Sequence, residues 1–175
     1  MDYIYNDYEY FNLIDDIMKN EKFKKIEKCM HHGLSRMDHS LRVSYFSYKI
    51  AKKLKLDFVS CARAGLLHDF FIQEDLTEFE QKISMFVHHT VALDNSCKYF
   101  DISNKEKNII VSHMFPVTLF KIPKYFESYL VSMVDKIVAV YDFGLSASFI
   151  MKKRYNTVNT SIFMFMIFCC YFNNL

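Results

Sequence analysis

The sequence predicts an all-α fold, and three observations lead to that prediction. The chain of 175 residues contains three glycines and two prolines, so residues that favour turns are scarce. Apolar residues make up 51% and charged residues 24%, which is the balance of a globular domain with its own core. Along most of the chain the apolar residues recur every three or four positions, which is typical of amphipathic helices. The length suits one domain, and a second full domain is not expected.

The first predicted helix covers residues 8–30, where apolar side chains recur at helical spacing between charged ones. Residues 31–34 interrupt this pattern, and Ser35 is a candidate N-cap for a second helix over 36–56. The residues expected to face inward from this second helix keep a rhythm of about 3.6 residues. They are Leu41, Val43, Phe46, Ile50, Ala51 and Leu54.

A third helix is predicted to open at Asp57 and to end at the adjacent pair His68 and Asp69. Further helices are expected at 79–87, 90–99, 105–114 and 124–142. The loop 116–123, with the sequence PVTLFKIP, separates the last two because a proline stands at each of its ends.

We therefore expect three regions: an N-terminal helical extension over 1–34, a main domain over 35–142 and an apolar helical segment over 143–175. Within the last region, residues 161–172 read SIFMFMIFCCYF. A dozen apolar residues are too few to cross a bilayer, which needs roughly 20, so no stable membrane insertion is expected. The segment is expected to belong to the same fold or to form an interface, and a homo-oligomer through it is one candidate arrangement.

Charge and cysteine content narrow the class of protein further. The net charge of +2 is too small to indicate a nucleic-acid partner, and the lysines between 19 and 28 alternate with glutamates as on a solvated helix face. The five cysteines are an odd number without a CxxC pair, and the start of the chain is acidic and aromatic, unlike a secretory signal. We expect reduced thiols in a cytoplasmic protein.

Histidines and aspartates recur at inward positions of successive predicted helices. A single buried histidine is usually structural, but six such side chains are expensive to bury without partners. Imidazole nitrogens and carboxylate oxygens are the ligands that borderline divalent metals prefer, and coordination offsets that cost. Six groups exceed the needs of one tetrahedral ion, which suggests two metals with Asp69 able to bridge them. The six are His39, His68, Asp69, His88, His113 and Asp135.

The segments DHSLRVSYFSYKIAKKL, ARAGLLHDFF, VHH, SHMFP and VDKI carry a resemblance to a known family. Their order of His, His-Asp, His, His and Asp resembles that of the dinuclear members of the HD-domain superfamily of metal-dependent phosphohydrolases. The resemblance covers roughly residues 35–142 and implies a compact helical bundle of the HD-domain type. It implies Fe, Mn, Zn, Co or Mg as the metal. The ligands that it implies are His39, His68, Asp69, His88, His113 and Asp135, with His89 as a register alternative to His88.

The resemblance also implies an activity: hydrolysis of a phosphomonoester or phosphoanhydride, with a nucleotide as the favoured small substrate, by water activated between the metals. Asp69 and His68 are the implied catalytic residues. Arg42 and Lys136 are candidates for binding phosphate; the alternatives are a surface ion pair for Arg42 and a surface lysine for Lys136. The symmetric dinucleoside-tetraphosphate hydrolases of the superfamily usually show His-Thr where this chain has His113-Met114, which argues against their particular substrate. The alternative function is a non-catalytic metal-containing module that senses a nucleotide or binds another protein.

Overall fold

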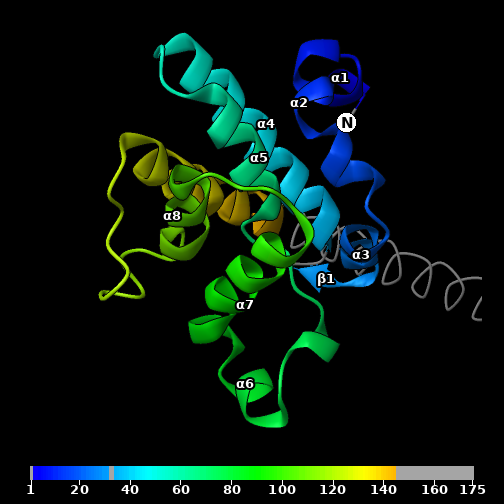
Figure 1. Cartoon of the computed structure of the whole chain (residues 1–175), viewed down its shortest axis with the longest axis vertical. Coiled ribbons are helices and arrows are strands. Elements are labelled where there is room, and N and C mark those ends of the chain that lie inside the picture. Colours follow the sequence, from blue (N-terminus) through cyan, green and yellow to red (C-terminus); the bar gives the residue numbers. More distant parts are fainter. Residues whose placement is uncertain (1, 32–33, 145–175) are drawn as a thin grey trace, which may run out of the picture.

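The computed structural model describes residues 2–31 and 34–144, and it confirms the all-α prediction. In the described part, β structure is limited to an antiparallel pair of two-residue strands, β1 (Met30–His31) and β2 (Leu34–Ser35). The remaining elements are helices, turns and loops (Figure 1). Of the predicted segment 143–175, residues 145–175 lie outside the described part, and the apolar run 161–172 is among them.

The N-terminal region is divided into short helices where the sequence predicted one. These are α1 (Asp2–Tyr5), α2 (Tyr8–Lys19), α3 (Glu21–Lys24) and the 3₁₀ helix η1 (Lys25–Lys28). A single helix over 8–30 was the wrong prediction because Asn20 has an extended backbone, with φ −73° and ψ 123°. Its side chain accepts hydrogen bonds from the backbone N–H groups of Lys22 and Phe23, so it ends one helix and caps the next.

Two long helices, α4 (Arg36–Lys53) and α5 (Phe58–Leu67), pack against each other at the centre of the molecule. The predicted cap Ser35 is confirmed, since it accepts from Asp38 N–H. Asp57, where the next helix was predicted to open, is also an N-cap and accepts from Ser60 N–H. The helices approach closely at Gly65, where an added Cβ would lie 2.9 Å from the Cα of Ser44. The two helices therefore form the closely packed centre of the bundle, and the other elements pack around them.

The N-terminal helices are fastened to this pair by polar contacts at the edge of an apolar core. Tyr10 of α2 is fully buried and donates from its hydroxyl to Ser44 Oγ at 2.7 Å, and Ser44 donates to the carbonyl of Ala62. Arg63 of α5 forms two hydrogen bonds with the carboxylate of Asp16, at 2.6 and 2.8 Å. Arg63 is thus a structural residue, which ties α5 to α2.

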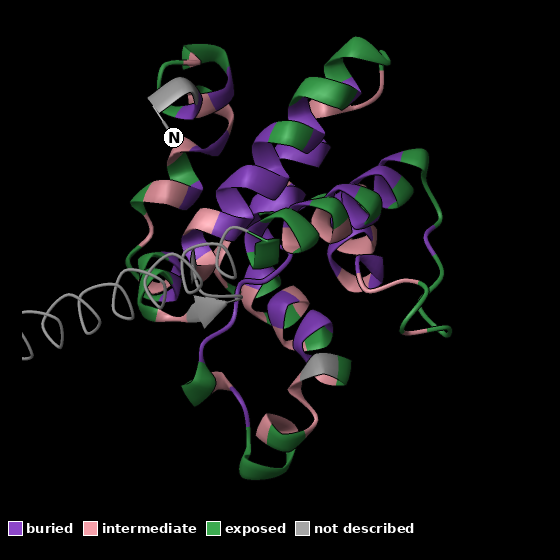
Figure 2. Ribbon diagram, turned by 180° about the vertical axis from the view of Figure 1, so that it is seen from behind, coloured by how far each residue is buried: buried purple, intermediate pink, exposed green. Residues whose placement is uncertain are grey.

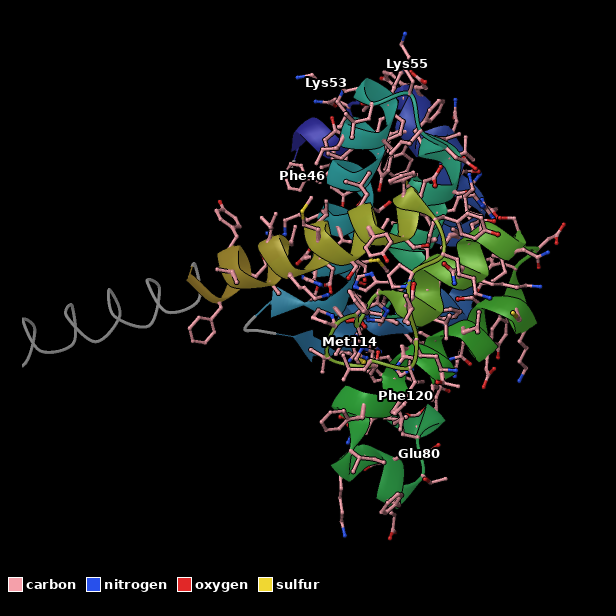
Figure 3. All side chains as sticks on the ribbon, turned by 90° about the vertical axis from the view of Figure 1, so that its left-hand side faces the viewer. Phe46, Lys53, Lys55, Glu80, Met114 and Phe120 are labelled. Atoms are coloured by element: carbon pink, nitrogen blue, oxygen red, sulfur yellow. The ribbon has the colours of Figure 1, made fainter. Side chains whose placement is uncertain are left out.

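The second half of the described chain supplies the rest of the bundle. It contains η2 (Gln73–Asp75), α6 (Glu78–Lys82), α7 (Ser84–Tyr99), α8 (Asn104–Ser112) and a helix over 126–144. The predicted pair of helices at 79–87 and 90–99 was wrong in its boundary, because the chain turns at Ile83 and then continues as one helix to Tyr99. The η2–α6 segment projects from the body as an arm with Glu80 near its tip (Figures 1 and 3).

Burial is concentrated along the α4–α5 pair (Figure 2). Three residues predicted to face inward are exposed instead: Phe46 by 38%, Ile50 by 38% and Leu54 by 59%. Phe46, which projects from α4 in Figure 3, and Ile50 line an apolar groove of about 530 Å³. The helix over 126–144 forms the opposite wall of this groove, with Val134, Ile137, Val138 and Tyr141. In the described part of the chain, no helix combines the length and the apolar character that crossing a membrane requires.

Candidate metal centre

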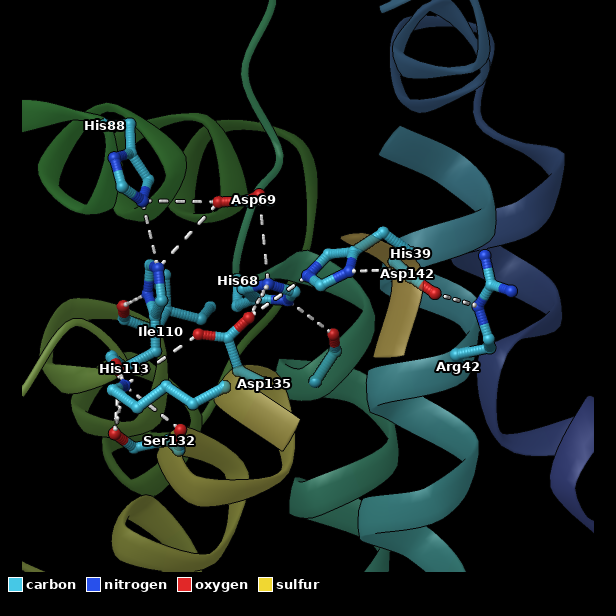
Figure 4. A network of polar contacts seen from close by, with 12 residues as sticks. His39, Arg42, His68, Asp69, His88, Ile110, His113, Ser132, Asp135 and Asp142 are labelled. Atoms are coloured by element: carbon cyan, nitrogen blue, oxygen red, sulfur yellow. Dashed lines mark hydrogen bonds and ion pairs between the residues drawn. The ribbon is translucent and has the colours of Figure 1, made fainter. Parts of the chain in front are cut away.

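Six side chains from five elements meet beside the α4–α5 pair (Figure 4). Two of them extend from within helices α4 and α7, and one from the helix over 126–144. The others stand where a helix stops, since His68 is the C-cap of α5, Asp69 follows it, and His113 is the C-cap of α8. Five of the six are buried and Asp135 is 13% exposed. The six are the predicted set: His39, His68, Asp69, His88, His113 and Asp135.

The two carboxylates connect the four imidazoles. Oδ1 of Asp69 lies 3.4 Å from Nε2 of His88 and 3.8 Å from Nε2 of His113. The other oxygen, Oδ2, lies 3.9 Å from Nε2 of His68. Oδ1 of Asp135 lies 3.1 Å from Nε2 of His39 and 3.5 Å from Nε2 of His68. Asp69 therefore directs one oxygen to each side of the cluster.

Three of the histidines share one local arrangement, in which Nδ1 bonds to a backbone carbonyl on the same helix. The pairs are His68 with Gly65 at 2.8 Å, His88 with Ser84 at 2.8 Å and His113 with Ile110 at 2.7 Å. A carbonyl oxygen only accepts, so in each pair Nδ1 carries a proton, and Nε2 carries a lone pair whenever the ring is neutral. These contacts direct three lone pairs into the cluster, as is usual for histidines that bind a metal.

His39 differs from the other three because its Nδ1 faces a carboxylate. The distance from Nδ1 to Oδ2 of Asp142 is 3.0 Å, and both side chains are fully buried. Oδ1 of Asp142 forms an ion pair with Nε of Arg42 at 3.3 Å. Sequence reasoning did not identify Asp142; its only signal was its position two helical turns beyond Asp135, on the same face of one helix.

The surroundings shift the protonation of these groups in opposite directions. Burial favours the neutral form of His39, but the neighbouring carboxylates of Asp135 and Asp142 prevail and raise its pKa to about 9. Burial would also raise the pKa of Asp135, but a hydrogen bond from His39 and the nearby imidazole of His68 hold it well below its usual value. Burial lowers the pKa of His113 to about 3, with His68 adding to the effect. His113 is therefore neutral at physiological pH, which is the form of an imidazole that can bind a metal.

Two observations test whether the cluster fits a divalent cation. The Nε2 atoms of His88 and His113 lie 3.1 Å apart, so two acceptor lone pairs face each other. Nε2 of His68 is buried and forms no hydrogen bond with any described residue. A divalent cation between the ligands would make both features favourable, since it would accept the lone pairs of the neutral rings. The donor set of imidazoles and carboxylates is the one that borderline divalent metals bind, so the residues fit such an ion.

The cluster opens on a pocket of about 350 Å³, which Asp69, His88 and Asp135 line from the metal side. Two cations also line it, Arg36 and Lys136. Nζ of Lys136 donates to the carbonyl of His113 at 2.8 Å, and burial lowers its pKa.

Sequence reasoning overlooked Arg36. Its guanidinium lies 3.8 Å above the ring of Phe71 and donates to the carbonyl of the same residue. Nε of Arg36 is buried without a hydrogen-bond partner among the described residues. A signal was present in the sequence, because Arg36 precedes His39 by three residues and so shares its helix face.

Two other candidates from the sequence lie at the margin. Arg42 contacts Asp142 behind His39 and lines the apolar groove, not the pocket beside the cluster. His89 is buried beside His88 but belongs to none of the ligand groups in the described part, whereas His88 does. Burial lowers the pKa of His89 to about 4, with His88 adding to the effect. The geometry therefore brings His88, and not His89, to the cluster.

Comparisons with known proteins gave one match. The family model described as HD domain matches residues 36–139, which is more than half of the chain. A search of curated proteins and a search of solved structures gave no match. All six residues of the cluster lie inside the matched range, and Asp142 lies three residues beyond its end.

Proposed function

The chain belongs to the HD-domain family, and on that premise we propose that it is a metal-dependent phosphohydrolase. Its substrate would be a small phosphomonoester or phosphoanhydride, with a nucleotide favoured. The observation that carries the proposal is the convergence of four Nε2 atoms and two carboxylates, with each Nδ1 bonded to an acceptor. A structural cluster would not need every imidazole to direct its Nε2 to the same small volume.

The proposed centre would hold two ions, with Asp69 able to serve both positions. One position would use His39, His68 and Asp69, and the other Asp69, His88 and His113, which are two of the groups whose ligand atoms lie within 4.8 Å of one another. Asp135 contacts His39 and His68 and would complete the first position. Bound divalent cations would supply Lewis-acid polarisation of the phosphoryl group and would lower the pKa of a water molecule toward neutrality.

Arg36 and Lys136 are proposed to bind the phosphate. Arg36 has a buried Nε that makes no hydrogen bond within the described part, and its guanidinium is held in place by Phe71. Lys136 donates to three oxygens: the carbonyls of His113 and Ser132 and the hydroxyl of Ser132. It would exchange one of them for a phosphate oxygen. Charge-assisted hydrogen bonds to a phosphate in such a pocket would strengthen as charge develops in the transition state.

Asp69 and His68 are the proposed catalytic residues. Asp69 lines the pocket and directs one oxygen to each side of the cluster, so it can orient the attacking water and accept its proton. The Nδ1 proton of His68 is engaged with the carbonyl of Gly65. His68 would therefore act through Nε2, as the ligand that stands between Asp69 and Asp135.

The pocket favours a small substrate. Its volume of about 350 Å³ is near the lower end of the range for ligand pockets, roughly 300–1,000 Å³. A phosphomonoester or a mononucleotide suits this volume better than a dinucleotide. Phe71 lines the pocket and stacks on His88, with ring centroids 5.4 Å apart, which leaves little room for a base beside that ring.

The test is a full-length protein purified without chelator, analysed for bound metal and assayed on nucleoside mono-, di- and triphosphates. We expect bound transition metal and release of phosphate or a nucleoside phosphate. Asp69→Ala should abolish hydrolysis in a protein that stays folded, while Asp101→Ala, at an exposed aspartate before α8, should change nothing.

The rival function, a non-catalytic metal-containing module, makes the opposite prediction. It expects no turnover of any nucleotide by the metal-loaded protein, together with a loss of stability in Asp69→Ala. The cytoplasmic location, the absence of a nucleic-acid partner and a homo-oligomer through the segment 143–175 remain predictions beside the enzymatic proposal.

A further inference from the structure

Asp142 distinguishes one histidine of the cluster from the other three. His68, His88 and His113 each bond through Nδ1 to a neutral carbonyl within their own helix. His39 instead bonds to the carboxylate of Asp142, which lies 103 residues further along the chain. The contact is fully buried on both sides, so no solvent screens it.

Two carboxylates from one helix enclose the His39 ring. Asp135 contacts Nε2 at 3.1 Å and Asp142 contacts Nδ1 at 3.0 Å. The two aspartates are seven residues apart, about two helical turns, and therefore lie on the same face of the helix over 126–144. Docking of that helix on α4 fixes both edges of the imidazole together.

Arg42 holds Asp142 in place from the far side. Its Nε lies 3.3 Å from Oδ1 of Asp142, while Oδ2 faces His39. The side chain of Arg42 is 9% exposed, and that of Asp142 is fully buried. A buried carboxylate with a cation on one oxygen and an imidazole on the other has a single favourable orientation, and that orientation fixes the His39 ring.

From this geometry we infer that Asp142 is a positioning residue, which acts through His39 to make the metal position of His39, His68 and Asp69 the tighter of the two. The inference rests on the proposed metal-dependent function. A carboxylate on Nδ1 keeps the proton there and raises the basicity of the ligating Nε2 more than a neutral carbonyl does. The position formed by Asp69, His88 and His113 has carbonyl partners on both of its histidines and lacks this effect.

The experiment is a titration of metal-stripped, full-length protein with Co²⁺, followed by calorimetry and by the visible absorption of the bound ion. The unmodified chain should bind two ions in two resolved steps. Asp142→Asn removes the negative charge and should weaken the tighter step by about 10- to 100-fold, which is typical for the loss of such a partner, and should leave the weaker step unchanged. The matched control is Glu106→Gln, which also neutralises a buried carboxylate paired with an arginine, Arg63, away from the cluster.

A double variant separates positioning from general damage. In His39→Ala the ligand is absent, so adding Asp142→Asn should weaken Co²⁺ binding no further. If Asp142→Asn does not fold, Asp142→Glu takes its place, because it keeps the charge beside Arg42 and displaces the carboxylate from Nδ1. The same selective loss of one step is then expected.

The outcomes are distinct. If both binding steps weaken together, if neither weakens, or if the two substitutions add in the double variant, the role of Asp142 is overturned while the metal centre stands. If the unmodified chain binds no Co²⁺, the proposed function fails first, and the inference about Asp142 fails with it.

Discussion

The Nε2 atoms of His88 and His113 face each other at 3.1 Å, and each ring donates its Nδ1 proton to a carbonyl of its own helix. In that tautomer the two facing nitrogens are both acceptors, so their contact is repulsive without a cation between them. Metal binding at this pair should therefore be detectable through the stability of the folded protein as well as through activity.

Metal loading should raise the melting temperature of the full-length protein. A ligand that binds only the folded state at a hundred times its Kd adds about 2.7 kcal/mol to the free energy of unfolding. We expect Mn²⁺ or Zn²⁺ to stabilise the unmodified chain, and chelation to reverse the effect, in a thermal unfolding experiment. His88→Ala should remove most of the response and His89→Ala should keep it, because His88 contacts Asp69 and His113. An equal loss in both variants would contradict the assignment of His88.

Arg36 and Arg42 offer a direct comparison of two candidate phosphate-binding residues. Arg36 lines the pocket beside the cluster, whereas Arg42 faces Asp142 and the apolar groove. Removing a charge-assisted hydrogen bond costs about 1.5–3 kcal/mol, so Arg36→Gln should lower kcat/KM by about 10- to 100-fold with metal content unchanged. Arg42→Gln is the counterpart and should lower kcat/KM less. A larger fall in Arg42→Gln would show that Arg42, the candidate from the sequence, binds the phosphate.

Gly65→Ala should damage both the fold and the metal centre. The added Cβ would meet the Cα of Ser44 at 2.9 Å, so α4 and α5 would have to separate, at a cost of about 1–3 kcal/mol. The carbonyl of Gly65 also accepts the Nδ1 proton of His68, so a shift of α5 would misplace this ligand. Chemical denaturation and metal titration should both show a loss. Val59→Ala is the control, since Val59 is an exposed residue of the same helix, and a similar loss there would refute the argument from close packing.

Asp75 should make stability depend on pH in the acid range. Burial opposes its ionisation, but hydrogen bonds from Lys22, the backbone N–H of Ile72 and Asn95 prevail and lower its pKa. A carboxyl with a lower pKa in the folded state stabilises that state above its unfolded pKa, about 3.9, and this contribution disappears as the pH falls through the folded pKa.

The measurement for Asp75 compares urea unfolding of the unmodified chain and Asp75→Asn across pH. The difference should be about 1.5–3 kcal/mol near pH 7 and should shrink steadily below about pH 4. A difference that is independent of pH would show that the substitution acts through shape and not through charge.

The positions of the six cluster residues were predictable because each stands on a helix whose apolar spacing or end the sequence marks. His68 follows a helix that Asp57 caps, and both signals are local. The helix boundaries at Asn20 and Ile83 were not predictable in the same way, since apolar residues continue past both. There a local backbone conformation overrides the periodic pattern.

Residues that depend on tertiary contacts were harder to foresee. Phe46 and Ile50 fit the inward spacing of α4, yet they face a groove whose other wall comes from residues 134–141. The role of Asp142 follows only from its contact with His39, which lies on a helix far away in the sequence. The position of Arg36 on the same helix face as His39 could be predicted from the sequence. Its contact with Phe71 could not, because it depends on the path of the chain after α5.

The helix over 126–144 supplies both carboxylates that hold the His39 ring, and this has a consequence for the order of assembly. During translation, the other three imidazoles can be oriented as soon as their own helices form, because their carbonyl partners are three or four residues away. His39 emerges from the ribosome before the other three, but its partners Asp135 and Asp142 are synthesised after all of them. Residue 142 must emerge before both contacts of that ring can form, so a cation would find His39 oriented only after the helix over 126–144 has been made.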